Sequence, residues 1–217
     1  MFLSIDSALA SKYPGLDVEV YAINGIRVRR ENPELEKFKA EIAERVKKRW
    51  TLEELKEYNI FRAYRDFFWR IGIDPTKNRP ASEALIRRIL HGNPLPKINT
   101  VVDAYNLASI ESTIAIAAFD KDELKGNLLM REAYNGETFL GIGMTTPIRL
   151  RGGEIVVSDD EKLIAIYPYR DAESSKITED TLNLLVLICG VPNIDKKQLL
   201  NARGIASEYI LRFSRED

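Results

Sequence analysis

The chain has 217 residues, of which 45% are hydrophobic and 30% charged, and its formal net charge is −1. This near balance of charge argues against a protein that coats nucleic acid non-specifically, and the hydrophobic share suffices for a packed core. The single cysteine, Cys189, excludes an intrachain disulfide and a cysteine-based metal cluster, and its apolar neighbours favour a buried, unreactive thiol. No apolar run is long enough to span a membrane, and the first residues lack a signal-peptide pattern. We therefore expect a cytoplasmic protein that uses no metal and no cofactor.

The first 72 residues predict short strands and several helices. Thr51-x-x-Glu54 has the spacing of a capping box at the start of one short helix. The helix over 59–72 carries an aromatic stripe, which is typical of a face buried in the core. The other elements expected here are strands over 2–5 and 17–29, a brief helix ending near Tyr13, and a charged helix over 33–50.

The next segment holds polar residues in places where they need partners. Ser82 is expected to cap a helix over 83–91. The apolar run over 98–110 then contains Asp103 and Asn106. Buried polar groups must be hydrogen-bonded, so these two are either structural ties or residues that face a pocket.

Positive charge is concentrated between Arg62 and Arg88, where seven basic residues accompany three acidic ones. A local excess inside a chain of net charge −1 suggests an anionic partner at one place. An ordinary solvated surface explains the same pattern. The choice depends on whether these side chains converge in space.

After Asp120 the sequence changes to short apolar runs separated by glycine turns, which predict strands and hairpins. Asp195-x-x-Gln198 then caps a closing helix. We predict one α+β domain over 1–217, with helices mainly in the N-terminal half packed on a mixed or antiparallel sheet. The expected strands cover 128–134, 138–143, 155–158, 163–167 and 182–189.

Few residues in this chain are suited to catalysis. The only histidine, His91, precedes the glycine that ends its helix, where a solvated position is expected. The charged groups around Asp159 and at Arg170-Asp171 are either parts of a site or an ordinary turn and a salt bridge. Composition therefore leaves the catalytic residues unknown.

Three ordered motifs resemble a known family. They are PKINTVVDAYN with the later AAFD, then VVSDDEK, and then SKITEDT. Together they resemble the B3/B4 tRNA-binding and editing module of the phenylalanyl-tRNA synthetase beta subunit, and in particular its freestanding relatives. The resemblance covers about 61–190, so 1–60 and 191–217 would be additions to that core.

The resemblance implies a partner and an activity. In the synthetase this module hydrolyses tyrosine wrongly attached to the phenylalanine tRNA, because a phenylalanine pocket rejects one added hydroxyl only about 100-fold. The family's pocket uses an asparagine that matches Asn106, a histidine where this chain has Ala117, and a glutamate where it has Lys176. Tyrosine editing by the family's own residues is therefore not expected. The matching regions imply a wider pocket of Asp103, Asn106, Ala117, Gly141, Gly143, Met144, Asp159, Arg170, Asp171 and Lys176, and RNA contacts from Arg79, Arg87, Arg88 and Lys97.

Two functions follow. The first is a freestanding tRNA-binding module in translation, with altered or lost hydrolysis of a mischarged aminoacyl-tRNA. The second is a binding protein for an amino acid or another small carboxylate, held by Arg170 and Lys176, without RNA or catalysis. The sequence does not set the oligomeric state.

Overall fold

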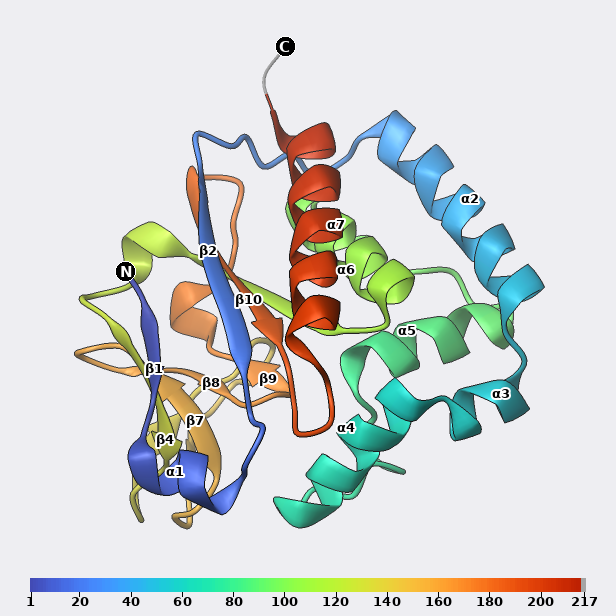
Figure 1. Cartoon of the computed structure of the whole chain (residues 1–217). Coiled ribbons are helices and arrows are strands. Elements are labelled where there is room, and N and C mark those ends of the chain that lie inside the picture. The colour runs from blue at the N-terminus through green and yellow to red at the C-terminus, as the bar shows by residue number, and fades with distance from the viewer. Residues whose placement is uncertain (216–217) are drawn as a thin grey trace.

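This computed structural model describes residues 1–215, in which a run of helices from α2 to α6 is followed by a run of strands from β3 to β10 (Figure 1). The fold class is α+β, as predicted, and most helices precede residue 113. Within the described residues, no helix combines the length and the apolar character that crossing a bilayer requires. The α-helices are α1 (Ser7–Lys12), α2 (Pro33–Arg49), α3 (Leu52–Glu57), α4 (Asn59–Arg70), α5 (Ala81–Leu90), α6 (Thr100–Ser112) and the closing α7 (Lys196–Ser214).

The first sheet has three antiparallel strands with β10 (Asn183–Cys189) between β2 (Val18–Asn24) and β3 (Ala115–Asp120). From Leu184 onward β10 is fully buried, as a central strand covered on both faces should be. Helices α6 and α7 pack against each other and against these strands (Figure 1). A strand from the first 24 residues therefore lies beside β10 in the sheet, and the last helix packs on that sheet.

The second sheet has the order β1-β4-β7-β8-β9. Its edge strand β1 runs parallel to β4, and the other neighbours are antiparallel, so the sheet is mixed. Its strands are β1 (Leu3–Ile5), β4 (Leu128–Glu132), β7 (Ile155–Ser158), β8 (Leu163–Ile166) and β9 (Arg170–Asp171). A small ladder of β5 (Thr138–Phe139) and β6 (Ile148–Arg149) and two 3₁₀ turns, η1 (Lys121–Glu123) and η2 (Glu173–Ser175), complete the described chain.

Local capping signals start most of the predicted helices. The capping boxes at Thr51 and Asp195 are both formed, and Asn99 caps α6 with its side-chain oxygen. The expectation for Ser82 is wrong. Helix α5 begins at Ala81, and the buried Ser82 hydroxyl donates a hydrogen bond of 2.9 Å to the carbonyl of Thr113. The side chain ties α5 to the end of α6 because that carbonyl would otherwise be buried without a partner.

Tyr64 fixes the helices to the first sheet. Its ring is fully buried in the aromatic stripe of α4, and its hydroxyl donates to the carbonyl of Cys189 on β10. The same oxygen accepts a hydrogen bond of 3.0 Å from the backbone of Ala115 on β3. One side chain thus holds the two strands in place where their facing residues border a cavity.

Candidate functional site

A small cavity lies between the first sheet and the turn from β8 to β9. Its volume is about 80 Å³. In the pairing of β3 with β10, Ala117 lies beside Leu187 and Ala115 beside Cys189. The small alanine side chains on β3 leave space next to these larger ones. We call it the Asp171 cavity; it is lined by Ala81, Ala115, Ile116, Ala117, the run 165–171, Leu187 and Cys189.

Asp171 is the acidic group of this cavity. Its carboxylate has no hydrogen-bond or ion-pair partner among residues 1–215. Burial without a compensating charge raises the pKa of Asp171 to about 7, since the ionised form loses hydration. The side chain can therefore bind and release a proton at neutral pH, which a general base requires.

Arg170 borders the same cavity from the exposed side. A Cβ on Gly141 would lie 2.5 Å from its Cδ and 3.1 Å from the sulfur of Met144, so Gly141 is required for this close approach. The backbone N–H of Ile142 donates to the carbonyl of Asp171 at 2.9 Å. Five of the predicted pocket residues thus lie together: Ala117, Gly141, Met144, Arg170 and Asp171.

Sequence reasoning missed Tyr105. Burial, together with the nearby carboxylates of Asp171 and Asp103, raises the pKa of its phenol. Burial likewise raises the pKa of the Cys189 thiol, with a further contribution from Asp171. Cys189 is buried, as predicted, and a protonated thiol is a poor nucleophile. The sequence signal for Tyr105 was its position beside Asn106 in a motif that carries the family resemblance.

Comparison with known proteins identifies the family. The model of the B3/4 domain matches residues 63–216. The chain belongs to the B3/4 domain family. The match includes every residue that lines the Asp171 cavity, so the cavity is a feature of the B3/4 domain.

Curated relatives of this B3/4 chain are beta subunits of phenylalanine–tRNA ligase. The subunit from Fusobacterium nucleatum is 35% identical over 92 residues, which are 42% of this chain and 11% of the relative. The subunit from Thermotoga maritima is 30% identical over 119 residues, or 54% and 15%. The chain therefore matches only a small part of each relative. An N-terminal fragment of the phenylalanyl-tRNA synthetase beta subunit from Pyrococcus horikoshii superposes with a TM-score of 0.45 and 12% identity, over 90% of this chain and 74% of that fragment.

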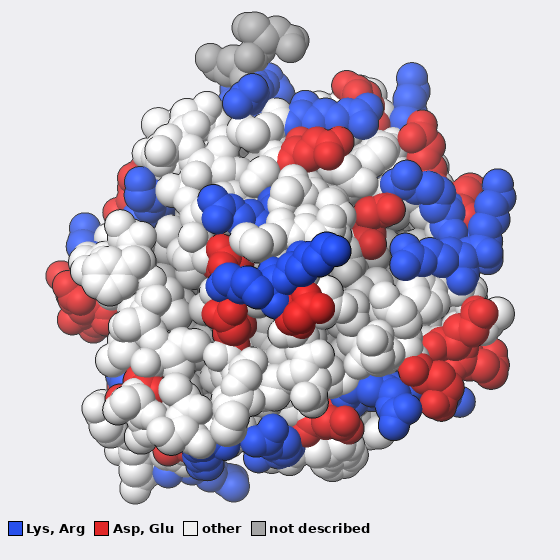
Figure 2. Space-filling model, viewed as in Figure 1, with Lys and Arg blue, Asp and Glu red and all other residues white. Residues whose placement is uncertain are grey.

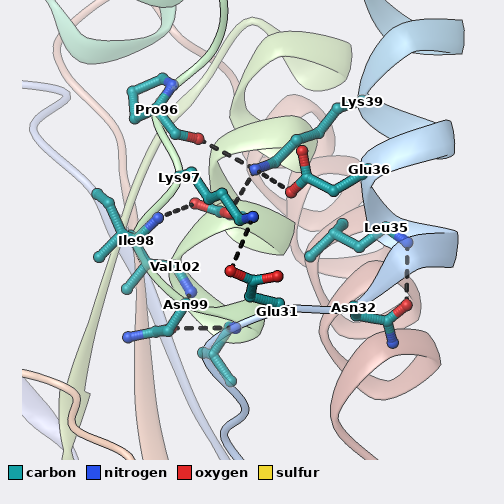
Figure 3. Close-up of polar contacts among 12 residues, drawn as sticks. Glu31, Asn32, Leu35, Glu36, Lys39, Pro96, Lys97, Ile98, Asn99 and Val102 are labelled. Carbon is teal, nitrogen blue, oxygen red and sulfur yellow. Dashed lines mark hydrogen bonds and ion pairs between the residues drawn. The ribbon is translucent and has the colours of Figure 1, made fainter.

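Asp103 of this B3/4 domain does not line the cavity. Its carboxylate binds the Lys39 ammonium at 2.5 Å and accepts a hydrogen bond of 3.1 Å from the N–H of Ile98 (Figure 3). Lys39 also donates to the carboxylate of Glu36 and to the carbonyl of Pro96. Burial outweighs these contacts and raises the pKa of Asp103. Of the two roles that the sequence left open for Asp103, this geometry is that of a structural tie.

Four further predicted pocket residues lie outside the cavity lining. Asp159 accepts hydrogen bonds from the backbone N–H groups of Lys125, Glu161 and Lys162, which makes it the organiser of a turn. Lys176 is exposed and forms an ion pair with Glu173. Asn106 is half-buried on α6, next to Tyr105. Gly143, with φ of 78°, belongs to the exposed loop after Gly141.

The four predicted RNA-binding residues differ in how they are held. The Arg87 guanidinium pairs at 2.8 Å with Glu83, whose side chain is only 1% exposed and which also binds Arg65. Arg88 donates to the carbonyl of Pro94, and Lys97 pairs with Glu31 at 3.0 Å (Figure 3). Arg79 is exposed and has no hydrogen bond or ion pair within residues 1–215.

Surface charge is mixed on the face that carries α7 and α2. Figure 2 shows both Lys and Arg and Asp and Glu on this face, with several basic side chains together at its right-hand edge, where α2 lies. In the described part of the chain, no group of three or more His, Cys, Asp or Glu side chains is arranged to hold a metal ion.

Proposed function

We propose that this chain binds the aminoacyl end of a tRNA and hydrolyses the ester between the amino acid and the terminal ribose. One observation carries the proposal: an unpaired carboxylate, Asp171, lines a small cavity within a B3/4 domain. The relatives are subunits of a ligase that acts on tRNA, which supports an aminoacyl-tRNA as the substrate class. The compartment we propose is the cytoplasm, where charged tRNA is used.

The hydrolysis needs one proton acceptor and one stabilised oxyanion. In its ionised form Asp171 accepts a proton from a water molecule while the water oxygen attacks the ester carbonyl carbon. Arg170, on the same cavity, supplies donors for the negative charge that develops on the carbonyl oxygen. The C–O bond to the ribose then breaks, and the leaving oxygen takes up the proton. The products are the free amino acid and a tRNA with its terminal hydroxyl restored.

This mechanism differs from the one implied by the family's motif residues. Ala117 offers no proton acceptor where the family has histidine, and Lys176 is an exposed cation paired with Glu173. Asp171 is therefore the group that we assign to proton transfer. Arg79 is the residue that we assign to a phosphate of the RNA, because it is exposed and precedes Ala81 at the cavity.

A deacylation time course tests the proposal. Wild type, Asp171→Asn and the exposed control Asp180→Asn are compared on a set of mischarged tRNAs. Losing a positioned base should lower the rate by about 10²–10⁴-fold in Asp171→Asn, while the control should match wild type. Equal rates in all three proteins would remove Asp171 from the mechanism. No hydrolysis of any ester by wild type would reject the enzyme.

The second candidate is a small-carboxylate binding protein. It is favoured by the finding that Arg87, Arg88 and Lys97 are engaged within the chain. Fluorescence polarisation with a labelled tRNA at low salt and calorimetry with free amino acids separate the two candidates. Binding of a free amino acid without tRNA binding would favour the second.

We also propose that 61–190 forms the ligand-binding core and that 1–60 and 191–217 act as additions within one domain. The pairing of β2 with β10 and the packing of α7 on α6 support it. A cooperative unfolding transition, seen at the same urea concentration by fluorescence and circular dichroism, is expected.

A further inference from the structure

The size of the Asp171 cavity points to a class of substrate. At about 80 Å³ it holds roughly six water molecules, if each needs roughly 10–15 Å³ of such space. We infer that the aminoacyl group it accepts has no side chain, as in glycine, or a small aliphatic one, as in alanine, and that tyrosine is excluded. This inference rests on the proposed function and adds the identity of the acyl group.

One wall of the cavity, formed by the first sheet, cannot yield easily. Leu187 is 1% exposed and lies on β10, which is hydrogen-bonded on both sides to β2 and β3. An alanyl group brings about five non-hydrogen atoms and a tyrosyl group about twelve, and a close-packed interior has no spare volume for the difference. Admitting the larger group on this side would require the central strand of the sheet to move.

The lining also favours an apolar side chain. Ala81, Ala115, Ala117 and Leu187 present only carbon atoms from their side chains, and the Tyr167 hydroxyl is already bonded to the carbonyl of Gly190. These walls present a carbon surface, which suits a small apolar side chain.

The experiment charges one tRNA with glycine, alanine, valine or tyrosine and measures single-turnover hydrolysis by wild type. We expect the glycyl and alanyl esters to react at least about 100-fold faster than the tyrosyl ester, because each surplus methylene group in a fitted pocket costs about 10–200-fold. A tyrosyl ester that reacts as fast as the alanyl ester would overturn the inference and leave the proposed hydrolase intact.

A pair of variants tests the wall directly. Leu187→Ala enlarges the cavity, whereas Leu185→Ala removes an equally buried leucine two residues away that pairs with Phe119 and does not line the cavity. We expect hydrolysis of the valyl ester to rise about 10-fold or more in Leu187→Ala only. An equal effect of both variants would contradict the assignment of Leu187 as the size-limiting wall.

A binding measurement distinguishes an error in the inferred size selection from an error in the proposed hydrolysis. Calorimetry with non-hydrolysable 3′-alanylamino- and 3′-tyrosylamino-adenosine uses the full chain with Asp171→Asn and needs no turnover. Preference for the alanyl compound, when wild type hydrolyses no ester, would reject the proposed chemistry and retain the size selection. Equal binding or preference for the tyrosyl compound would reject the size selection itself.

Discussion

At the scale of single residues, Arg170 and Asp171 are neighbours in sequence with opposite charges that do not pair. The Arg170 stem packs against Gly141, and its guanidinium lies 5.9 Å from the centre of the Tyr169 ring. The Asp171 carboxylate is therefore left unneutralised in the cavity. Such an arrangement costs stability, and groups of this kind are concentrated at functional sites.

The stability of Asp171→Asn should reveal that cost. The pKa of Asp171 rises from an ordinary 3.8 to about 7 on folding, so the folded state binds more protons between these values. Unfolding free energy should therefore fall as pH increases from about 4 to about 7, by at most roughly 4 kcal/mol. Urea unfolding at pH 5 and pH 8 should show this loss in wild type and not in Asp171→Asn, which should be the more stable protein at pH 8. A variant destabilised at both pH values would indicate a structural partner for the carboxylate.

The same titration predicts the pH dependence of activity. Only ionised Asp171 can accept a proton, so the rate of ester hydrolysis should increase through pH 7 and then level off. Single-turnover rates check this over about 1.5 pH units on either side of the pKa. Each rate is corrected for spontaneous hydrolysis of the ester. A flat profile would remove Asp171 as the base.

At the scale of elements, a buried ion pair joins helix α2 to helix α6. Lys39 on α2 and Asp103 on α6 are 64 residues apart in sequence and meet at 2.5 Å (Figure 3). Their side chains are 8% and 3% exposed, so neither charge can be hydrated if its partner is lost. The pair fixes the placement of α6, which also carries Tyr105 and Asn106.

Removing one partner of this pair should be far worse than removing both. Lys39→Met leaves the Asp103 carboxylate buried alone and should cost roughly 3–5 kcal/mol, whereas Lys39→Met with Asp103→Leu should be much closer to wild type. The control Lys47→Met breaks an exposed pair with Glu44 and should cost at most about 1 kcal/mol. Unfolding free energies from urea titration decide the matter, and equal costs for the single and double variants would argue against a coupled buried pair.

At the scale of the whole molecule, positive and negative charges nearly balance. The chain has a net charge of −1, and the described basic residues mostly contact acidic groups or backbone carbonyls. Binding to RNA, if it follows the proposal, must therefore rest on few phosphate contacts. The affinity for RNA should therefore depend only weakly on salt concentration. It should fall by about 0.7–0.9 decades per tenfold increase in salt for each phosphate contacted.

Arg79 and Arg87 should separate RNA binding from stability. Arg79→Ala should weaken binding of all tRNAs about equally, without changing the unfolding free energy. The slope of log affinity against log salt concentration should become shallower by roughly the contribution of one phosphate contact. Arg87→Ala should instead destabilise the fold, because it leaves the buried Glu83 with Arg65 as its remaining cation. Polarisation with labelled tRNA and urea unfolding measure the two effects. Reversed effects would show that Arg87 is the residue that contacts RNA.

The sequence by itself determined the features that depend on residues close together in the chain. The helical periodicity, the capping boxes at Thr51 and Asp195 and the buried aromatic stripe of α4 involve side chains within a few positions of each other. The family motifs are likewise continuous segments. For this reason the α+β class, the closing helix and the B3/4 family all follow from the sequence alone.

Only the tertiary structure decided which distant side chains meet. Ala115–Asp120 is rich in alanine and was not predicted as a strand, yet it forms β3 because β10 offers a hydrogen-bonding edge. In the same way, Asp103 is neutralised by Lys39 while Asp171 is left without a partner. Both are single carboxylates in apolar surroundings, and their roles differ because the packing of layers brings a cation to one and a cavity to the other. That outcome depends on register and helix placement, which no short stretch of sequence encodes.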